Sequence, residues 1–176
     1  MSALYFKLAG AACIMAAAAA YGEFRARTLV QRVNQLQQFQ RSLKLLAAEI
    51  AFARSVLPYA FKTVGGQCSS PVREIYLAAS EALLAGKELP ANVAWREAVL
   101  QSYPQSCFTA TDREIIESVG VSLGVSEQEG QMKQIQLTAQ HLEFALEEAR
   151  DNSRRQVKLW RYLGYISGAA LIILLL

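Results

Sequence analysis

Two apolar runs lie near the ends of the chain, and amphipathic helical patterns fill the residues between them. The first run covers residues 4–21 and the second covers residues 159–176. A helix crosses the roughly 30 Å hydrocarbon core of a bilayer with about 17–25 mostly apolar residues. Trp160, Tyr162 and Tyr165 would place aromatic rings at the interface for the second run. The pattern predicts two terminal transmembrane helices, and a buried core helix is the alternative for the second run.

A cleaved signal peptide is the alternative for the first run, because residues 16–20 offer many small residues at which cleavage could occur. The only basic residue ahead of the cleavage region is Lys7, which already lies inside the apolar run. Arg25, Arg27 and Arg32 follow the run, and basic residues on that flank oppose translocation. We therefore expect the first span to be retained.

Basic residues are concentrated at the inner edge of both apolar runs. Residues 23–62 contain seven Lys or Arg and two acids. A second cluster consists of Arg150, Arg154, Arg155, Lys158 and Arg161. Cytoplasmic flanks of membrane spans are enriched in Lys and Arg, so both termini are predicted to lie outside. This gives a multi-pass protein of the cell membrane, with spans at 1–22 and 159–176 and a cytoplasmic helical domain at 23–158.

The residues between the spans are predicted to be helical, with two matching apolar seams. In the first long helix the seam is Phe39, Leu43, Leu46, Ile50, Ala53 and Leu57, and in the last it is Met132, Ile135, Ala139, Leu142, Leu146 and Ala149. Alternating spacings of three and four residues are typical of coiled-coil packing. The predicted fold is all-α: a membrane-anchored antiparallel helical hairpin or bundle with two terminal transmembrane helices.

Capping residues and prolines predict short helices between the two long ones. Ser70 is expected to cap a helix that Pro71 opens, and another helix stops before Pro104. The spacing of a hydroxyl residue and a glutamate predicts capping boxes at residues 111–114 and 126–129. These signals divide the middle of the chain into several short helices.

The distribution of charge argues against nucleic acid as a partner. The chain of 176 residues has a net charge of +3, but its basic residues are mostly those near the predicted spans, where an anionic lipid bilayer attracts them. Residues 72–130 contain nine acids and four basic residues. An acidic domain favours a protein partner that carries a basic patch, and an ordinary solvated surface is the alternative.

No pattern in the sequence predicts catalysis, a cofactor or a metal. The chain lacks the Gly-rich phosphate-binding, nucleophile-elbow and zinc-protease motifs. Its single histidine, His141, has no nearby cysteine, and Cys13, Cys68 and Cys107 are isolated from one another. Unpaired cysteines fit a reducing compartment such as the cytoplasm. We predict a protein that is not an enzyme.

Two sets of residues are candidates for binding. The first is a corner at Leu123 and Gly124, flanked by the acids Glu114, Glu117, Glu127 and Glu129 and by Trp95 as an apolar anchor. Gly124 is expected to adopt a left-handed turn, and tryptophan is enriched at binding hot spots. The alternative is that Trp95 belongs to the core and that the acids are simply solvated. The second set, Gly164 and Gly168, forms a GxxxG pattern that permits close packing of membrane helices.

The order and spacing of several fragments resemble the stage III sporulation protein AB family of endospore-forming bacteria. The fragments are an Arg-rich helix after the first span, Glu49-Ile50, Leu57-Pro58, Gly86 followed by Ala94-Trp95 and Ala98, residues 122–126 followed by Gln131, and residues 159–164 before an Ile/Leu tail. The resemblance covers essentially the whole chain. It carries no catalytic residues.

The resemblance implies a role in the mother cell, in a multi-protein complex of the membrane around the forespore. Members of the family are similar to the cytoplasmic helical domain of the type II secretion platform protein. By that similarity, the chain would connect a cytoplasmic secretion-type ATPase to the other membrane subunits of a channel. The sequence also leaves open whether copies of the chain associate as a homo-oligomer.

Two other classes of protein are alternatives to this function. A membrane-anchored coiled-coil signalling or scaffold module, unrelated to secretion, would usually need a sensor outside the membrane, and little of the chain is predicted there. A membrane enzyme acting on lipid or cell wall would need reactive groups near the spans, where only Ser2, Lys7, Cys13 and Ser167 are available. The non-enzymatic platform is therefore the leading hypothesis.

Overall fold

A computed structural model describes residues 2–53, 56–85, 89–124 and 128–175, and the regular elements within these ranges are all helices. In chain order they are α1 (Ser2–Ala48), the π-helical turn η1 (Glu49–Ala53), α2 (Leu57–Gly66), α3 (Val72–Leu84), α4 (Ala91–Ser102), the 3-10 turn η2 (Tyr103–Gln105), α5 (Ala110–Ser118), the 3-10 turn η3 (Val119–Ser122) and α6 (Gln128–Leu175). The predicted all-α class is confirmed.

The chain forms two compact units, which are described separately. Unit 1 contains residues 1–31 and 149–176, and unit 2 contains residues 32–148. The long helices α1 and α6 contribute to both units, whereas α2 to α5 belong to unit 2. The predicted domain boundaries, after residues 22 and 158, depend on where a membrane lies and stay predictions.

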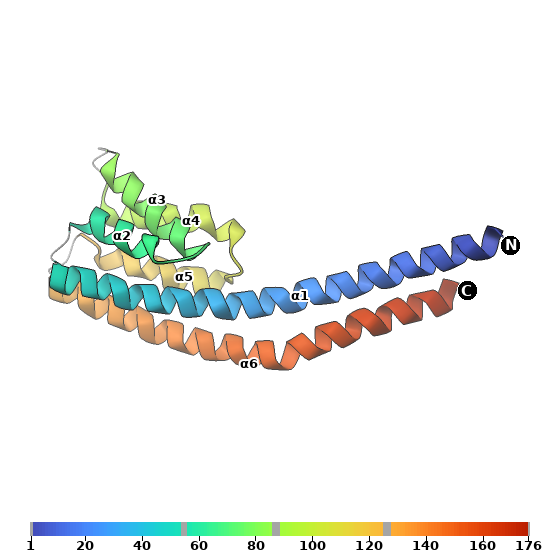
Figure 1. The fold of residues 1–176 in the computed structure, drawn as a ribbon. Coiled ribbons are helices and arrows are strands. Elements are labelled where there is room, and N and C mark those ends of the chain that lie inside the picture. Colours follow the sequence, from blue (N-terminus) through green and yellow to red (C-terminus); the bar gives the residue numbers. More distant parts are fainter. Residues whose placement is uncertain (1, 54–55, 86–88, 125–127, 176) are drawn as a thin grey trace. The chain divides into compact units, whose positions relative to one another are not determined.

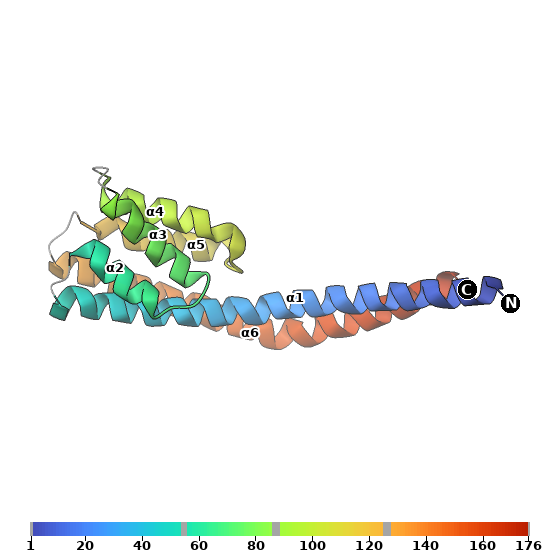
Figure 2. The same ribbon diagram turned by 45° about the horizontal axis from the view of Figure 1, so that its top comes forward.

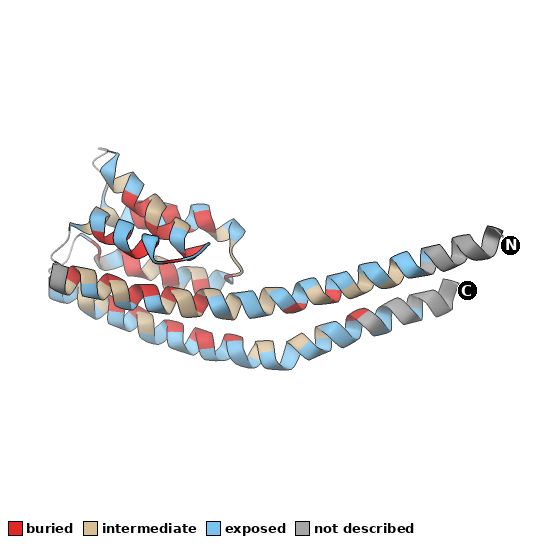
Figure 3. Ribbon diagram, viewed as in Figure 1, coloured by how far each residue is buried: buried red, intermediate tan, exposed pale blue. Residues whose placement is uncertain are grey.

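The framework of unit 2 is an antiparallel pair of helices. Figures 1 and 2 both show residues 32–53 beside residues 128–148, with the two segments running in opposite directions. Six seam residues of unit 2 are at most 3% exposed: Phe39, Leu43 and Leu46 on α1, and Ile135, Leu142 and Leu146 on α6. Figure 3 shows the buried positions recurring along both segments. The predicted pairing of two apolar seams is confirmed for these residues.

An aromatic cluster forms the core where α2, α3 and α4 pack together in unit 2. Phe61, Tyr76 and Trp95 contribute one ring from each of these helices, and Phe39 adds a fourth from α1. The ring centroids of contacting pairs are 5.2–6.3 Å apart, within the range of favourable aromatic packing. The Tyr76 hydroxyl lies 3.0 Å from the hydroxyl of Ser42, and burial raises the pKa of the Tyr76 phenol. The cluster therefore joins the short helices to the helical pair.

A buried ion pair connects α1 to the start of α5. Arg32 donates two hydrogen bonds to the Asp112 carboxylate, from Nε at 2.7 Å and from Nη2 at 2.9 Å. The Asp112 side chain is fully buried, and its hydrogen bonds raise the pKa of the Arg32 guanidinium. One turn further along α1, Gln35 Oε1 accepts a hydrogen bond of 2.8 Å from the backbone N–H of Cys107. These contacts fix the loop before α5 against α1.

The capping box of α5 lies two residues earlier than predicted. Thr109 is the N-cap, and its hydroxyl accepts from the backbone N–H of Asp112 while the Asp112 carboxylate accepts from the N–H of Thr109. The box at residues 111–114 is therefore wrong, because α5 already includes Thr111. The second predicted box, at residues 126–129, lies partly outside the described residues.

The start of α3 also differs from the prediction. The helix begins at Val72 with Pro71 as its N-cap, and no side chain caps it. The Ser69 carbonyl accepts from the N–H of Arg73, and the Pro71 carbonyl accepts from Ile75, so backbone oxygens hold the first turn. The predicted Ser70 cap is wrong because these carbonyls take its place.

Unit 1 brings the two long helices together around one tryptophan. Tyr21 packs edge-on against Trp160 with ring centroids 6.3 Å apart, and the Arg25 guanidinium lies 5.0 Å from the centre of the same ring. Arg161 donates a hydrogen bond of 2.9 Å to the Glu23 carboxylate. These contacts pair α1 with α6 at the inner ends of the two predicted spans.

Within the residues that the structure describes, no helix has a stretch both long and apolar enough to cross a membrane. The two terminal spans stay predictions.

Candidate functional site

The predicted docking corner lies between α5 and α6 in unit 2. The 3-10 turn η3 continues α5, and the N–H of Leu123 donates to the carbonyl of Gly120 at 3.1 Å. Gly124 has a φ of +73°, which confirms its predicted left-handed conformation. A Cβ at Gly124 would lie 3.1 Å from the Cβ of Ala91, the first residue of α4. The corner is thus held against α4.

The four acids predicted to flank the corner differ in their surroundings. Glu114 and Glu129 are exposed. Glu117 is partly buried and forms an ion pair with Arg113 at 3.1 Å, and Arg96 of α4 lies 3.8 Å from it. Glu127 lies outside the described residues. Glu114 and Glu129 therefore remain available to a basic partner, whereas the charge of Glu117 is partly balanced within the fold.

Trp95 is a core residue and does not serve as a surface anchor in this structure. Its side chain is fully buried, and its indole N–H donates a hydrogen bond of 2.9 Å to the carbonyl of Ile116. A Cβ placed at Gly120 would lie 2.9 Å from the Trp95 ring, so η3 packs directly over the indole. Leu123 is also fully buried. The core interpretation of Trp95 is correct, because α1, α2, α3, α5 and η3 all contact its side chain.

Val121, an exposed apolar residue of the corner, was not predicted from the sequence. Val121 of η3 is 69% exposed, and Val93 of α4 is 37% exposed. Val121 lies between Gly120 and Gly124, in a segment whose sequence shows no helical periodicity, so its exposure could not be predicted. Val121 is therefore the apolar side chain that the corner exposes, whereas Trp95 is buried.

The chemistry of the corner is suited to binding. Exposed carboxylates and an accessible valine can form ion pairs and apolar contacts with another protein. Among the residues that were described, no three His, Cys, Asp or Glu side chains gather closely enough to hold a metal ion. His141 is exposed on α6.

The glycine predicted to pack helices lies at a close contact in unit 1. A Cβ at Gly164 would lie 2.8 Å from the carbonyl oxygen of Ala18, and one at Gly22 would lie 2.6 Å from the carbonyl oxygen of Trp160. Only residues without a side chain permit this approach of the two backbones. The surroundings of Gly168 are not described. Close packing is present at Gly164, and its position in a membrane stays a prediction.

The structure defines an all-helical protein in which, within unit 2, short helices pack on an antiparallel pair formed by parts of α1 and α6. The chain belongs to the Stage III sporulation protein AB family, whose model matches residues 7–176. Stage III sporulation protein AB of Bacillus subtilis (strain 168) is 28% identical over 170 residues, which cover 97% of this chain and 99% of that protein. This confirms the family that the sequence fragments predicted and implies a role in sporulation.

A solved structure of Stage III sporulation protein AB (SpoIIIAB) shares the fold. It is 26% identical, superposes with a TM-score of 0.65, and the match covers 70% of this chain and 96% of that chain. The family is not a known enzyme family.

Proposed function

We propose that the protein is a non-enzymatic platform subunit of a sporulation channel complex between mother cell and forespore. Its terminal helices anchor it in the mother-cell membrane, and its helical domain docks a secretion-type ATPase on the cytoplasmic side. Membership of the Stage III sporulation protein AB family is the observation that carries this proposal.

Exposed apolar side chains in unit 1 support the membrane anchor. Phe24 is 66% exposed, and Leu159, Tyr162, Leu163 and Ile166 are each 54–64% exposed along the second predicted span and its edge. A group of exposed apolar side chains is unfavourable in water, but it is favourable in contact with lipid tails. Basic residues on the same segments would then meet anionic headgroups, with tyrosine and tryptophan at the interface.

The close contact in unit 1 supports packing with other membrane subunits. An apolar cavity of about 160 Å³ lies beside the glycine contact and is lined by Tyr21, Trp160 and Leu163, among others. In a bilayer, association between helices depends on such close fits because lipid tails are as apolar as the side chains. A side chain from a helix of another subunit, or of a second copy, would fill this cavity.

The corner at Gly124 supports the docking of the ATPase. Exposed Glu114 and Glu129 provide negative charge, and exposed Val121 provides apolar contact. Residues 72–130 carry a net negative charge, so an approaching basic surface would be steered toward this part of unit 2.

Reversing the charge of Glu127 and Glu129 to lysine is expected to weaken binding of the ATPase without unfolding the protein. Glu129 lies exposed in the first turn of α6, so its reversal loses only about 0.3–1 kcal/mol of favourable interaction with the helix dipole. The loss of affinity should arise mainly from slower association at low salt. Association and dissociation rates of the purified ATPase of the same cell would be measured over a salt series.

The matched control reverses Glu143 and Glu147, two exposed acids further along α6. This control variant should bind as the wild type does. Equal affinity of wild type and the Glu127→Lys/Glu129→Lys variant at every salt concentration would place the docking surface elsewhere.

A further inference from the structure

The apolar cavity of unit 1 lies on one side of the α1–α6 pair. Its lining includes Ala18 and Tyr21 of α1 and Trp160 and Leu163 of α6, and its volume is about 160 Å³. Ser167 also lines it, but its hydroxyl donates to a backbone carbonyl of the same helix, so the lining remains suited to an apolar group. A cavity of roughly 150 Å³ holds one benzene molecule. The cavity therefore has room for one large apolar side chain.

The length of the cavity favours such a side chain over a lipid tail. The lining on α6 extends over residues 160–167, which is about 10 Å along a helix. A lipid tail extends through one leaflet, about half of the roughly 30 Å hydrocarbon core. The end of a tail would lie outside the cavity, whereas a single side chain fits within it.

Arg25 lies at the edge of this cavity. Its guanidinium is 5.0 Å from the centre of the Trp160 ring, and Trp160 lines the cavity. A guanidinium has five N–H donors, and its contact with an aromatic face leaves donors free to bind a carboxylate. Arg25 is exposed, and it takes part in none of the ion pairs found among the described residues. The edge of the cavity thus offers a cation that is ready to bind an anion.

The acids of unit 1 do not supply this anion. Unit 1 contains eight Lys or Arg and two acids, Glu23 and Asp151. The Glu23 carboxylate already accepts from Arg27 at 3.0 Å and from Arg161 at 2.9 Å. Asp151 lies roughly 13 Å along α6 from the tryptophan that Arg25 contacts. A carboxylate that binds Arg25 therefore comes from another molecule.

A second copy of the chain is an unsuitable source of this carboxylate. Copies that lie side by side in one membrane place the same residues at the same depth. Each copy would bring its own excess of Lys and Arg to the Arg25 of the other, and like charges brought together oppose association. A helix of a different subunit is not restricted in this way.

We propose that this side of unit 1 binds a transmembrane helix of another subunit, which places a carboxylate beside Arg25 and a large apolar side chain in the cavity. The inference rests on the proposed membrane anchor, and it names the chemistry of the helix that packs against it. Trp160 contacts Arg25 and also lines the cavity, so the two groups of the partner lie close together. On the partner helix they stand about one turn apart, at positions i and i+3 or i+4.

The test uses the full chain, labelled with 5-fluorotryptophan, in nanodiscs of zwitterionic lipid. The chain has two tryptophans, so fluorine NMR gives one signal for Trp160 and one for Trp95, which is buried in unit 2 and serves as an internal control. The probe is a capped helical peptide of about 22 leucine and alanine residues, long enough to span the bilayer, with one aspartate in its last turn. Its counterpart carries asparagine instead.

The Trp160 signal should shift with the aspartate peptide at a peptide-to-lipid ratio about tenfold lower than with the asparagine peptide, because only aspartate forms a charge-assisted pair with Arg25. The Trp95 signal should stay in place with both peptides. This difference between the two peptides measures recognition of the carboxylate, and the shift that they share measures filling of the cavity.

Variants separate the two parts of the site. Arg25→Gln should remove the preference for the aspartate peptide. Arg155→Gln should retain it, because Arg155 is an exposed cation five positions before Trp160, on a different face of α6. Ala18→Leu fills the cavity and should weaken binding of both peptides to the same extent. An unchanged Trp95 signal confirms that unit 2 of each variant is folded.

The proposal is overturned if the Trp160 signal does not move, or if it moves equally with both peptides. It is also overturned if anionic lipid without peptide produces the larger shift, which would indicate a lipid site, or if the shift grows with the number of chains per nanodisc, which would indicate a second copy. A chain that does not enter nanodiscs would show that the proposed membrane anchor is wrong, and the inference would fall with it. A chain that enters them without a Trp160 response would leave the anchor intact and refute the inference alone.

Discussion

Replacement of Asp112 by alanine is expected to lower the free energy of unfolding by about 3–5 kcal/mol, the cost of removing one partner from a buried ion pair. The variant leaves Arg32, whose side chain is only 12% exposed, without its bidentate partner. It also removes the carboxylate that accepts from the N–H of Thr109 at the start of α5. Both effects act on the junction between α1 and α5, so unit 2 should unfold at lower denaturant concentration.

Two controls identify the source of this loss. Removing both partners, as Arg32→Ala/Asp112→Ala, should cost less than the sum of the two single variants, because no buried charge is left unpaired. Glu117→Ala breaks the more exposed pair with Arg113 and should cost at most about 1 kcal/mol. If Asp112→Ala were as stable as Glu117→Ala, Arg32 would find another partner, and the ion pair would not hold this junction together.

Substitution of Leu146 by aspartate should be at least as destabilising. Leu146 is 3% exposed in the seam between α1 and α6, and truncation of a buried leucine alone typically costs about 2–5 kcal/mol. A carboxylate in its place adds the penalty of an unpaired charge in an apolar interface. Thermal unfolding of the variant should occur far below that of the wild type, or the protein should fail to fold.

Phe144 provides a control on the same helix. It is 70% exposed, so Phe144→Asp is expected to change the free energy of unfolding by less than about 0.5 kcal/mol. A large loss for Phe144→Asp together with no loss for Leu146→Asp would mean that α6 presents its other face to α1. The seam would then have been assigned to the wrong residues.

The seam could be predicted from the sequence because the buried face of a helix carries apolar residues at a regular spacing of three and four positions. Phe39, Leu43 and Leu46 are spaced four and three residues apart, and Leu142 and Leu146 are four apart, so each set lies on one face of its helix. Gly124 was predictable for a similar reason, since a glycine at the end of a helix commonly adopts a positive φ. Both features depend on residues close together in the chain.

The start of α5 could not be predicted because two overlapping patterns compete. Thr109 and Asp112 have the same spacing as Thr111 and Glu114, so both pairs can form a capping box. The first pair is used, and its aspartate also binds Arg32, which lies 80 positions away in the sequence. Local spacing carries no information about such a distant partner.

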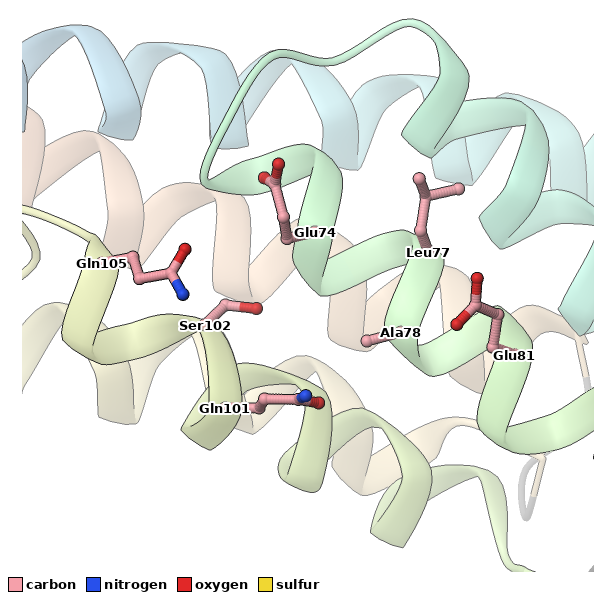
Figure 4. Close-up of a pocket in the computed structure, with 7 residues that line it drawn as sticks. All are labelled: Glu74, Leu77, Ala78, Glu81, Gln101, Ser102 and Gln105. Carbon is pink, nitrogen blue, oxygen red and sulfur yellow. The ribbon is translucent and has the colours of Figure 1, made fainter.

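The candidate site was predictable only in part, for the same physical reason. Whether Trp95 lies on the surface depends on how η3 and the short helices close around it, and its hydrogen-bond partner Ile116 is 21 residues away. A cavity between α3 and α4 likewise combines two acids of α3, Glu74 and Glu81, with polar residues of α4 and η2 (Figure 4).

The proposed platform lies in the membrane with its helical domain inside the cell. Cysteine labelling of intact cells tests this orientation most directly. In a full chain with Cys13, Cys68 and Cys107 replaced, a single cysteine would be placed at position 67 or at position 2. Gln67 is exposed just after α2, so a thiol there should react readily wherever the reagent can reach it. With a membrane-impermeant thiol reagent, position 2 should be labelled from outside, and position 67 only after the cells are opened. Labelling of position 67 in intact cells would contradict the orientation, and with it the role of this domain in docking a cytoplasmic ATPase.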